Sequence, residues 1–203
     1  MKIYAIIIII CLLFSCGTAK KIQKYDDLGR LSKTTYYDNG EIKSIELIRY
    51  FKNTKKPINI QYLRNSEKKI VPQKEITYTY RSNKISSIKY YIYKRNKKVP
   101  TGIQKYVHRG KQLTRIEYHS FYKNNRNHKI GLDYYYYKKN YNTIKTRRII
   151  ELKYNPAFNR TQQTAQYLIK YNNEQPISIK YSFINKSGKY QEEIWRNKQI
   201  VIN

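Results

Sequence analysis

The sequence predicts an all-β protein, an antiparallel meander of roughly ten to twelve strands with little helix outside an N-terminal leader. The chain has 24 Tyr against a single Trp, and many tyrosines adjoin another aromatic or β-branched residue, which favours strands over helices. Short runs alternate between apolar and polar residues, and turn residues separate them. Runs joined by hairpins without βαβ crossovers give an antiparallel sheet, which can be an open curved sheet, a half-barrel or a barrel.

The chain begins with a short apolar leader. Lys2 supplies a positive charge, and residues 3–14 are almost purely apolar. As a helix this stretch would span only about 18 Å, well short of the roughly 30 Å hydrocarbon core of a bilayer. A cleaved signal peptide over residues 1–15 therefore fits better than a permanent transmembrane helix.

The end of the leader, Leu13-Phe14-Ser15-Cys16, is followed by Gly17. It resembles the lipobox of bacterial lipoproteins, although Phe14 is bulkier than the usual residue. The resemblance implies cleavage before Cys16 and lipidation of that cysteine, by a diacyl thioether and usually an amide-linked fatty acid such as palmitate. The alternative is an ordinary secretory leader, with Cys16 discarded or left as a thiol. Cys11 would leave with the leader, so the mature chain could form no internal disulfide.

After the leader, residues 16–24 are expected to be a lipidated N-terminus and basic tether, and residues 25–203 a single β-meander domain. Alternating runs lie at Glu75–Tyr80, Ile85–Tyr90, Leu113–Tyr118 and Ile177–Tyr181. The stretch Thr161 to Ile169 is the best helix candidate, but it also fits a strand. Turns are predicted at Asp38-Asn39-Gly40, Arg81-Ser82-Asn83, Arg95 to Lys98, Arg109-Gly110, Lys123 to Asn127, Asn155-Pro156, Asn172-Asn173 and Lys186-Ser187-Gly188.

Two stretches near the start, Tyr25–Leu31 and Tyr37–Ile42, share a Tyr-Asp pair, a turn with Gly and a following aliphatic residue. Asp and Asn side chains can close a local turn, and Gly accepts a positive φ. The pattern resembles YD repeats of the Rhs type and MORN-repeat variants of bacterial antitoxin-like proteins. The resemblance implies stacked hairpins in an extended sheet.

The charge is strongly positive, with 42 Lys and Arg, 13 Asp and Glu and a net charge of +29. Such basicity favours anionic partners, here a lipid headgroup, an acidic glycan or an acidic protein. The exported location argues against nucleic acid. The alternative is that the lysines reflect an AT-rich genome and only keep a sheet soluble.

No catalytic or metal-binding pattern occurs, so we expect neither an enzyme nor a cofactor. His108, His119 and His128 are too widely spaced for a typical zinc site. The adjacent acids Asp26-Asp27 and Glu192-Glu193 would point to opposite faces of a strand.

The candidate binding residues are tyrosines interleaved with basic side chains, which could stack on sugars or bases while the cations meet anionic groups. Because Tyr134 to Tyr137 are consecutive, some of these rings must lie on each face of their strand. The candidates are Lys89, Tyr91, Tyr93 and Arg95, and Tyr135, Tyr137, Arg147 and Arg148.

These observations predict a non-enzymatic lipoprotein of the bacterial cell envelope, held in the outer membrane on its periplasmic face through Cys16. Its basic, tyrosine-rich sheet would bind an anionic envelope component or a partner protein. The alternative, which rests on the repeat resemblance, is an immunity or antitoxin-like protein that neutralises a cognate toxin.

Overall fold

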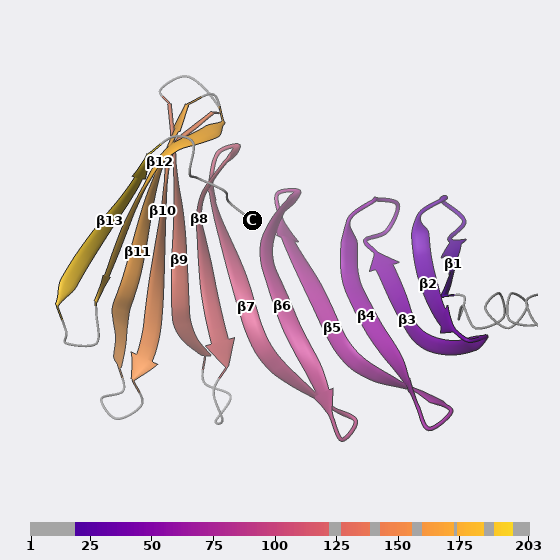
Figure 1. Ribbon diagram of the computed structural model, residues 1–203. Helices are drawn as coiled ribbons and strands as arrows, with labels where there is room; N and C mark the ends of the chain where they lie inside the picture. The colour runs from indigo at the N-terminus through magenta and orange to yellow at the C-terminus, as the bar shows by residue number, and fades with distance from the viewer. Residues whose placement is uncertain are drawn as a thin grey trace, which may run out of the picture. The chain divides into compact units, whose positions relative to one another are not determined.

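The computed structural model describes residues 19–121, 127–138, 143–155, 160–172, 174–184 and 189–196. They form thirteen strands of one antiparallel sheet, whose spatial order follows the chain order from β1 to β13 (Figure 1). Pairing ends at β1 on one side and at β13 on the other, so the sheet does not close. The predicted all-β meander is confirmed as an open sheet. Cys16 lies outside the described residues.

The strand bounds show where the predicted elements fall. The stretch from Thr161 to Ile169 is part of a strand, and the turn at Lys123 to Asn127 overlaps the start of β9 at its last residue. The strands are β1 (Lys20–Tyr25), β2 (Leu31–Asp38), β3 (Glu41–Tyr50), β4 (Pro57–Ser66), β5 (Lys69–Arg81), β6 (Lys84–Lys94), β7 (Lys97–Arg109), β8 (Gln112–Phe121), β9 (Asn127–Tyr137), β10 (Ile144–Asn155), β11 (Arg160–Asn172), β12 (Gln175–Ile184) and β13 (Tyr190–Arg196).

The first strand differs from expectation. Lys20–Tyr25 pair with β2 through Lys20↔Tyr37 to Tyr25↔Leu31, so most of the segment expected to be a tether is strand. All six residues of β1 are exposed. Its three lysines and one glutamine hide the alternation that marks other strands, and its backbone pairing with β2 supplies the order.

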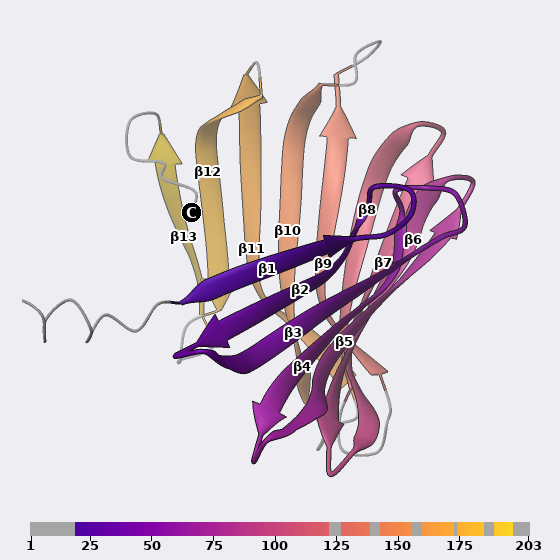
Figure 2. The ribbon, with the colours of Figure 1, turned by 90° about the vertical axis from the view of Figure 1, so that its right-hand side faces the viewer.

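The chain divides into two compact units. Unit 1 comprises Met1–Thr77 and Tyr91–Val99, and unit 2 comprises Tyr78–Tyr90 and Pro100–Asn203. In unit 1, β1 to β4 lie side by side as successive antiparallel neighbours (Figure 2). In unit 2, β8 to β13 are paired in the same way. The prediction of a single domain stays a prediction.

Tight turns with positive φ connect several of the strands. Asn39 and Gly40 have φ of 50° and 81°, and Ser82 and Asn83 have φ of 47° and 63°. Positive φ at both central residues is typical of type I′ turns, whose twist matches that of a hairpin. These turns lie where the sequence predicts them.

Buried side chains are few, and several are polar. In unit 2 the buried apolar residues include Ile150 and Ile169, whereas the most buried side chains among the described residues are the polar ones of Thr34, Asp133 and Ser182. No helix among the described residues covers a face of the sheet, and none is long and apolar enough to cross a membrane. Where no described helix covers the sheet, neighbouring side chains on the same face bury one another.

Candidate functional site

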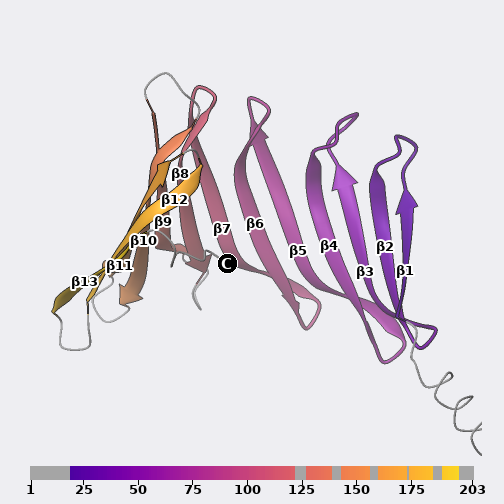
Figure 3. The ribbon, with the colours of Figure 1, turned by 45° about the horizontal axis from the view of Figure 1, so that its top comes forward.

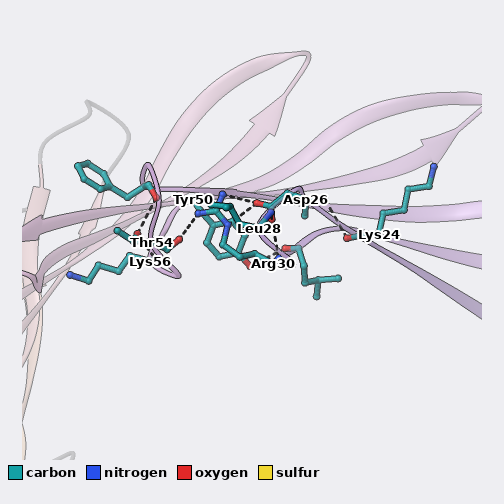
Figure 4. A network of polar contacts seen from close by, with 10 residues as sticks. Lys24, Asp26, Leu28, Arg30, Tyr50, Thr54 and Lys56 are labelled. Carbon is teal, nitrogen blue, oxygen red and sulfur yellow. Dashed lines mark hydrogen bonds and ion pairs between the residues drawn. The ribbon is translucent and has the colours of Figure 1, made fainter.

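The turn between β1 and β2 shows what the Tyr-Asp repeat does (Figure 4). Asp26 Oδ1 accepts hydrogen bonds from the backbone N–H groups of Leu28 and Arg30, and its other oxygen accepts from the Arg30 guanidinium at 2.7 Å. Gly29 has a φ of 68°. The turn role predicted for this motif is confirmed for this copy.

Arg30 ties the same turn to the neighbouring hairpin. Its guanidinium donates to the carbonyl of Thr54 and lies 4.7 Å from the ring centre of Tyr50, whose hydroxyl donates to the carbonyl of Leu31. The hydrogen bonds from Arg30 lower the pKa of Asp26. This arrangement joins the β1–β2 turn to the loop between β3 and β4.

Two of the predicted binding tyrosines, Tyr91 and Tyr93, belong to a network around Glu75 in unit 1. The Tyr93 hydroxyl donates to Glu75 Oε2 at 2.6 Å, and Asn59 Nδ2 donates to Oε1 at 2.6 Å. Lys98 forms an ion pair with the same carboxylate, and its ammonium lies 4.2 Å from the ring centre of Tyr91.

Glu75 is only 8% exposed, and burial alone would raise its pKa. Hydrogen bonds from Lys98 and Tyr93 outweigh that effect and lower the pKa below its usual value. The pKa of Tyr93 is raised by burial and by the bond to Glu75. A carboxylate with so many donors is a satisfied structural group.

The other two members of this predicted set lie apart from the network. Lys89 is exposed on β6 and belongs to unit 2. Arg95 is exposed in the β6–β7 turn with a φ of 48°. The structure thus brings Tyr91 and Tyr93 together and leaves both predicted cations outside their cluster.

The second predicted set is organised around Asp133 in unit 2. Arg147 binds both oxygens of this carboxylate, with Nε at 2.9 Å from Oδ1 and Nη2 at 2.7 Å from Oδ2. The Tyr135 hydroxyl donates to Oδ2 at 2.8 Å, and Arg147 lies 5.4 Å from the Tyr135 ring centre. The Asp133 side chain is 1% exposed and that of Arg147 is 30% exposed, so the carboxylate of this bidentate pair is removed from water while the guanidinium is only partly buried.

The remaining two residues of this set have different surroundings. The Tyr137 hydroxyl donates to the carbonyl of Leu113 at 2.8 Å. Arg148 follows Arg147 on β10 and therefore points to the opposite face, where its Nη2 lies 2.6 Å from Gln166 Oε1. The alternation expected for the tyrosine run is confirmed, because Tyr134 pairs across the sheet with Arg148 and Tyr135 with Arg147.

A third cluster surrounds Glu117, on β8. Its carboxylate contacts Arg115 at 2.9 Å, Lys129 at 3.5 Å and His119 Nε2 at 3.3 Å. Burial lowers the pKa of His119, and the contact with Glu117 only partly offsets that shift. The imidazole is therefore neutral at pH 7, with Nε2–H donating to Glu117. Its buried Nδ1 has no hydrogen-bond partner among the described residues.

Stacked rings cover part of unit 2. Tyr181 lies between neighbouring rings, with centroids 4.5 Å from Tyr167 and 5.9 Å from Trp195. Phe183 continues the stack 5.0 Å from Tyr181. Parallel rings that cover one another's faces leave mainly their edges for a ligand.

The three histidines stay separate in environment. His119 bonds to Glu117, and the His128 ring stacks on Tyr154 with centroids 3.5 Å apart. His108 lines a hollow between two hairpin tips. Nowhere in the described part of the chain do three His, Cys, Asp or Glu side chains gather as a metal site would require.

The sequence did not single out Glu75, Glu117 or Asp133, the carboxylates around which the basic and tyrosine side chains gather. Each is an isolated acid in a strand otherwise rich in aromatic and basic residues. That isolation was the available signal, because a lone acid in a basic, half-buried strand needs a cation nearby.

No family model matches the sequence, and no curated protein matches it. Several solved structures have a similar backbone trace. One is a protein of unknown function from Bacteroides fragilis that is 12% identical in sequence. The alignment covers 62% of this chain and 93% of that protein, with a TM-score of 0.47. A DUF3836 family protein from Bacteroides vulgatus is 14% identical; the alignment covers 45% of this chain and 91% of that protein, with a TM-score of 0.35. A TcdB2-TccC3 chain is 11% identical; the alignment covers 84% of this chain and 15% of that chain, with a TM-score of 0.22.

Proposed function

We propose that this protein is a non-enzymatic envelope lipoprotein, anchored by a lipid on Cys16, whose basic sheet binds an anionic component of the envelope. The observation that carries the proposal is the position of β1. This fully exposed strand contains Lys20, Lys21 and Lys24, and it starts four residues after Cys16.

The distance from the anchor limits where these lysines can act. Four residues span at most about 14 Å when fully extended. A lipid on Cys16 would hold the start of β1, at Lys20, within one to two Debye lengths of the headgroups, since that length is about 8 Å at physiological ionic strength. Lysines at this distance would be attracted to anionic headgroups or to acidic glycans at the surface.

The ion pairs of the sheet support a cationic surface. Buried acids are matched inside the sheet, as Glu75 is by Lys98 and Asp133 is by Arg147. Lys and Arg outnumber Asp and Glu by 42 to 13, so internal pairing cannot neutralise the cations. Exposed lysines such as Lys89 and Lys105 remain on the surface of unit 2.

The tyrosines have a supporting role in this proposal. Tyr93 and Tyr135 donate their hydroxyls to buried carboxylates, so these rings hold the sheet together. Exposed lysines, and not the predicted tyrosine sets, would meet the anionic partner.

The anchor is tested by a cysteine substitution. Cys16→Ala is expected to abolish metabolic labelling by palmitate and to move the protein from the membrane to the soluble envelope fraction. Cys11→Ala is the matched control, because that cysteine lies within the leader. Membrane retention of the unlabelled Cys16→Ala protein would contradict the anchor.

The proposed binding to an anionic envelope component is tested separately, by capture of partners from the envelope at low salt. Binding to anionic glycan or lipid that is lost as salt rises supports the proposal. A tight one-to-one complex with a single acidic protein would support the immunity-protein alternative instead.

A further inference from the structure

Two hairpin tips in unit 2 enclose a basic hollow. The β5–β6 and β7–β8 tips lie next to each other (Figure 3), and the Lys84 ammonium of the first donates to the Gly110 carbonyl of the second. The hollow has a volume of about 390 Å³, within the range of small-ligand sites. It is lined by Arg81, Ser82, Lys84, Ile85, Ser86, Tyr106, Val107, His108 and Gly110.

The polar lining of this hollow is suited to an anion. Arg81 and Lys84 supply two cations from the first hairpin, and His108 supplies an imidazole from the second. No carboxylate lines it, and among the described residues none lies within ion-pair distance of Lys84. The cationic field is therefore not neutralised locally.

A hollow between two hairpin tips in unit 1 has a lining of mixed charge. It lies at the tips of the β2–β3 and β4–β5 hairpins, has a volume of about 630 Å³, and is lined by Asp38, Glu41 and Glu67 as well as Lys43 and Lys68. Mixed charge there, including the ion pair between Lys43 and Asp38, leaves little net attraction for an anion. Neighbouring hairpin tips alone do not therefore produce a cationic hollow.

The Gly110 carbonyl holds the Lys84 ammonium, and tight turns fix the backbone of both hairpin tips. Ser82 and Asn83 form the β5–β6 turn with positive φ, and Gly110 turns the β7–β8 hairpin with a φ of 57°. Ser86 donates its hydroxyl to the carbonyl of Thr79 at 3.1 Å, which fixes that side chain at the wall. Groups fixed before binding lose little conformational freedom when the ligand enters.

We propose that this hollow binds a phosphate group. Arg81 offers a planar fork of donors that suits an oxyanion, and Lys84 adds a compact charge. The His108 imidazole and the Ser82 hydroxyl can donate to the remaining oxygens. The site goes beyond the proposed function and does not depend on the lipid anchor, because every residue that forms it lies in unit 2.

His108 provides a direct readout. Burial lowers its pKa, and Lys84 adds to the effect. The charged or titratable groups that line the hollow with it are Lys84 and Arg81 from the first hairpin and Tyr106 on its own strand. A bound phosphate would offset the two positive charges and stabilise the imidazolium, so the pKa of His108 should rise on binding.

The test is a titration of the full chain in neutral detergent with inorganic phosphate, followed by NMR of the histidine side chains. His108→Gln assigns the resonance. The expected result is a saturable shift of the His108 signal and a rise in its pKa, with His119 and His128 unmoved. Lys84→Gln and Arg81→Gln should each weaken the phosphate affinity about tenfold, the usual effect of losing a hydrogen bond to a charged group.

Lys89→Gln is the matched control, because Lys89 is an exposed lysine on the same strand as Lys84 but does not line the hollow. It should leave the affinity unchanged. A His108 signal that does not respond to phosphate, or an equal loss in Lys89→Gln, would overturn the proposal. Arg81 is exposed, so its variant remains informative if Lys84→Gln disturbs the hairpin tips.

Vesicles separate the two sources of phosphate. If the natural ligand is a lipid headgroup, vesicles containing phosphatidic acid should shift the His108 signal, and inorganic phosphate should compete with them. If the site takes a soluble phosphate compound, inorganic phosphate alone should produce the shift. Either pattern supports the site, and the absence of both contradicts it.

Discussion

Buried carboxylates determine the side-chain arrangement at the scale of single residues. Asp133 receives two bonds from Arg147 and one from Tyr135. In a sheet without a covering layer, such a network both neutralises the acid and holds an aromatic ring against its neighbours. The sequence predicted that Tyr135 and Arg147 lie together. It did not indicate Asp133, the carboxylate that binds both side chains.

Removal of this carboxylate tests its structural role. Asp133→Ala leaves the partly buried Arg147 without its bidentate partner and should reduce the free energy of unfolding by about 2–3 kcal/mol, somewhat less than for a fully buried pair. Urea denaturation measures the change. Asp27→Ala, at an exposed turn position, is the control and should stay within about 0.5 kcal/mol. Equal effects of the two substitutions would contradict the role given to Asp133.

His119 predicts a pH dependence. Its pKa in the folded protein lies below the ordinary value of 6.5, so the unfolded chain binds more protons between the two values. This histidine therefore costs no stability above pH 6.5, and its contribution becomes unfavourable as the pH falls from there through the folded pKa.

Denaturant unfolding at a series of pH values measures this effect. His119→Gln should flatten the fall in stability below pH 6.5. A pH profile that is identical in the wild type and His119→Gln would show that the imidazole is not the group responsible.

At the scale of elements, turns with Gly or Asn were predictable and others were not. Asn39-Gly40 and Ser82-Asn83 adopt positive φ, as their composition indicates. The β4–β5 turn does so as well, with φ of 53° at Glu67 and 63° at Lys68. No sequence rule selects Glu-Lys for that conformation, so this turn follows from the pairing of β4 with β5.

The strained turn gives a stabilising substitution. Lys68→Gly should raise the free energy of unfolding by about 1 kcal/mol, because a left-handed conformation costs a non-glycine residue roughly that amount. Thermal denaturation measures the gain. Lys69→Gly, one residue into β5, should instead destabilise the protein. Destabilisation by Lys68→Gly would contradict the strain at this turn.

Strand β1 could not be predicted from a pattern in the sequence. Period-two patterns appear only where one face of a strand is buried, and all six residues of β1 are exposed. Its order comes from backbone bonds to β2, which leave no trace in side-chain composition. Lys20, Lys21 and Lys24 are therefore held at the edge of the sheet by pairing with β2.

At the scale of the whole molecule, the strand order followed from local patterns, whereas the partners in each cluster did not. Asp133 and Arg147 are 14 residues apart, and Glu75 and Lys98 are 23 apart. Which of many lysines meets which acid depends on strand register, and register shifts occur in pairs such as β9 with β10. Composition can therefore indicate a basic, tyrosine-rich sheet without indicating its contacts.

We propose that an excess of exposed cations holds this sheet to an anionic surface. Each lysine near such a surface contributes about 1 kcal/mol. Replacing Lys20, Lys21 and Lys24 together by Gln should therefore weaken binding by up to about 100-fold. Lys52, Lys55 and Lys69, all in unit 1, replaced together by Gln, provide a control with the same change in charge and should weaken binding less.

The most direct measurement is the salt dependence of binding to vesicles that contain anionic lipid, made with a protein that begins at Gly17, so that neither the apolar leader nor a lipid can attach. Binding should be strong at about 50 mM salt and fall at least tenfold by about 300 mM, as screening shortens the reach of the lysines. Vesicles of neutral lipid should not bind. Binding that is insensitive to salt, or absent from every anionic surface at low salt, would contradict the claim.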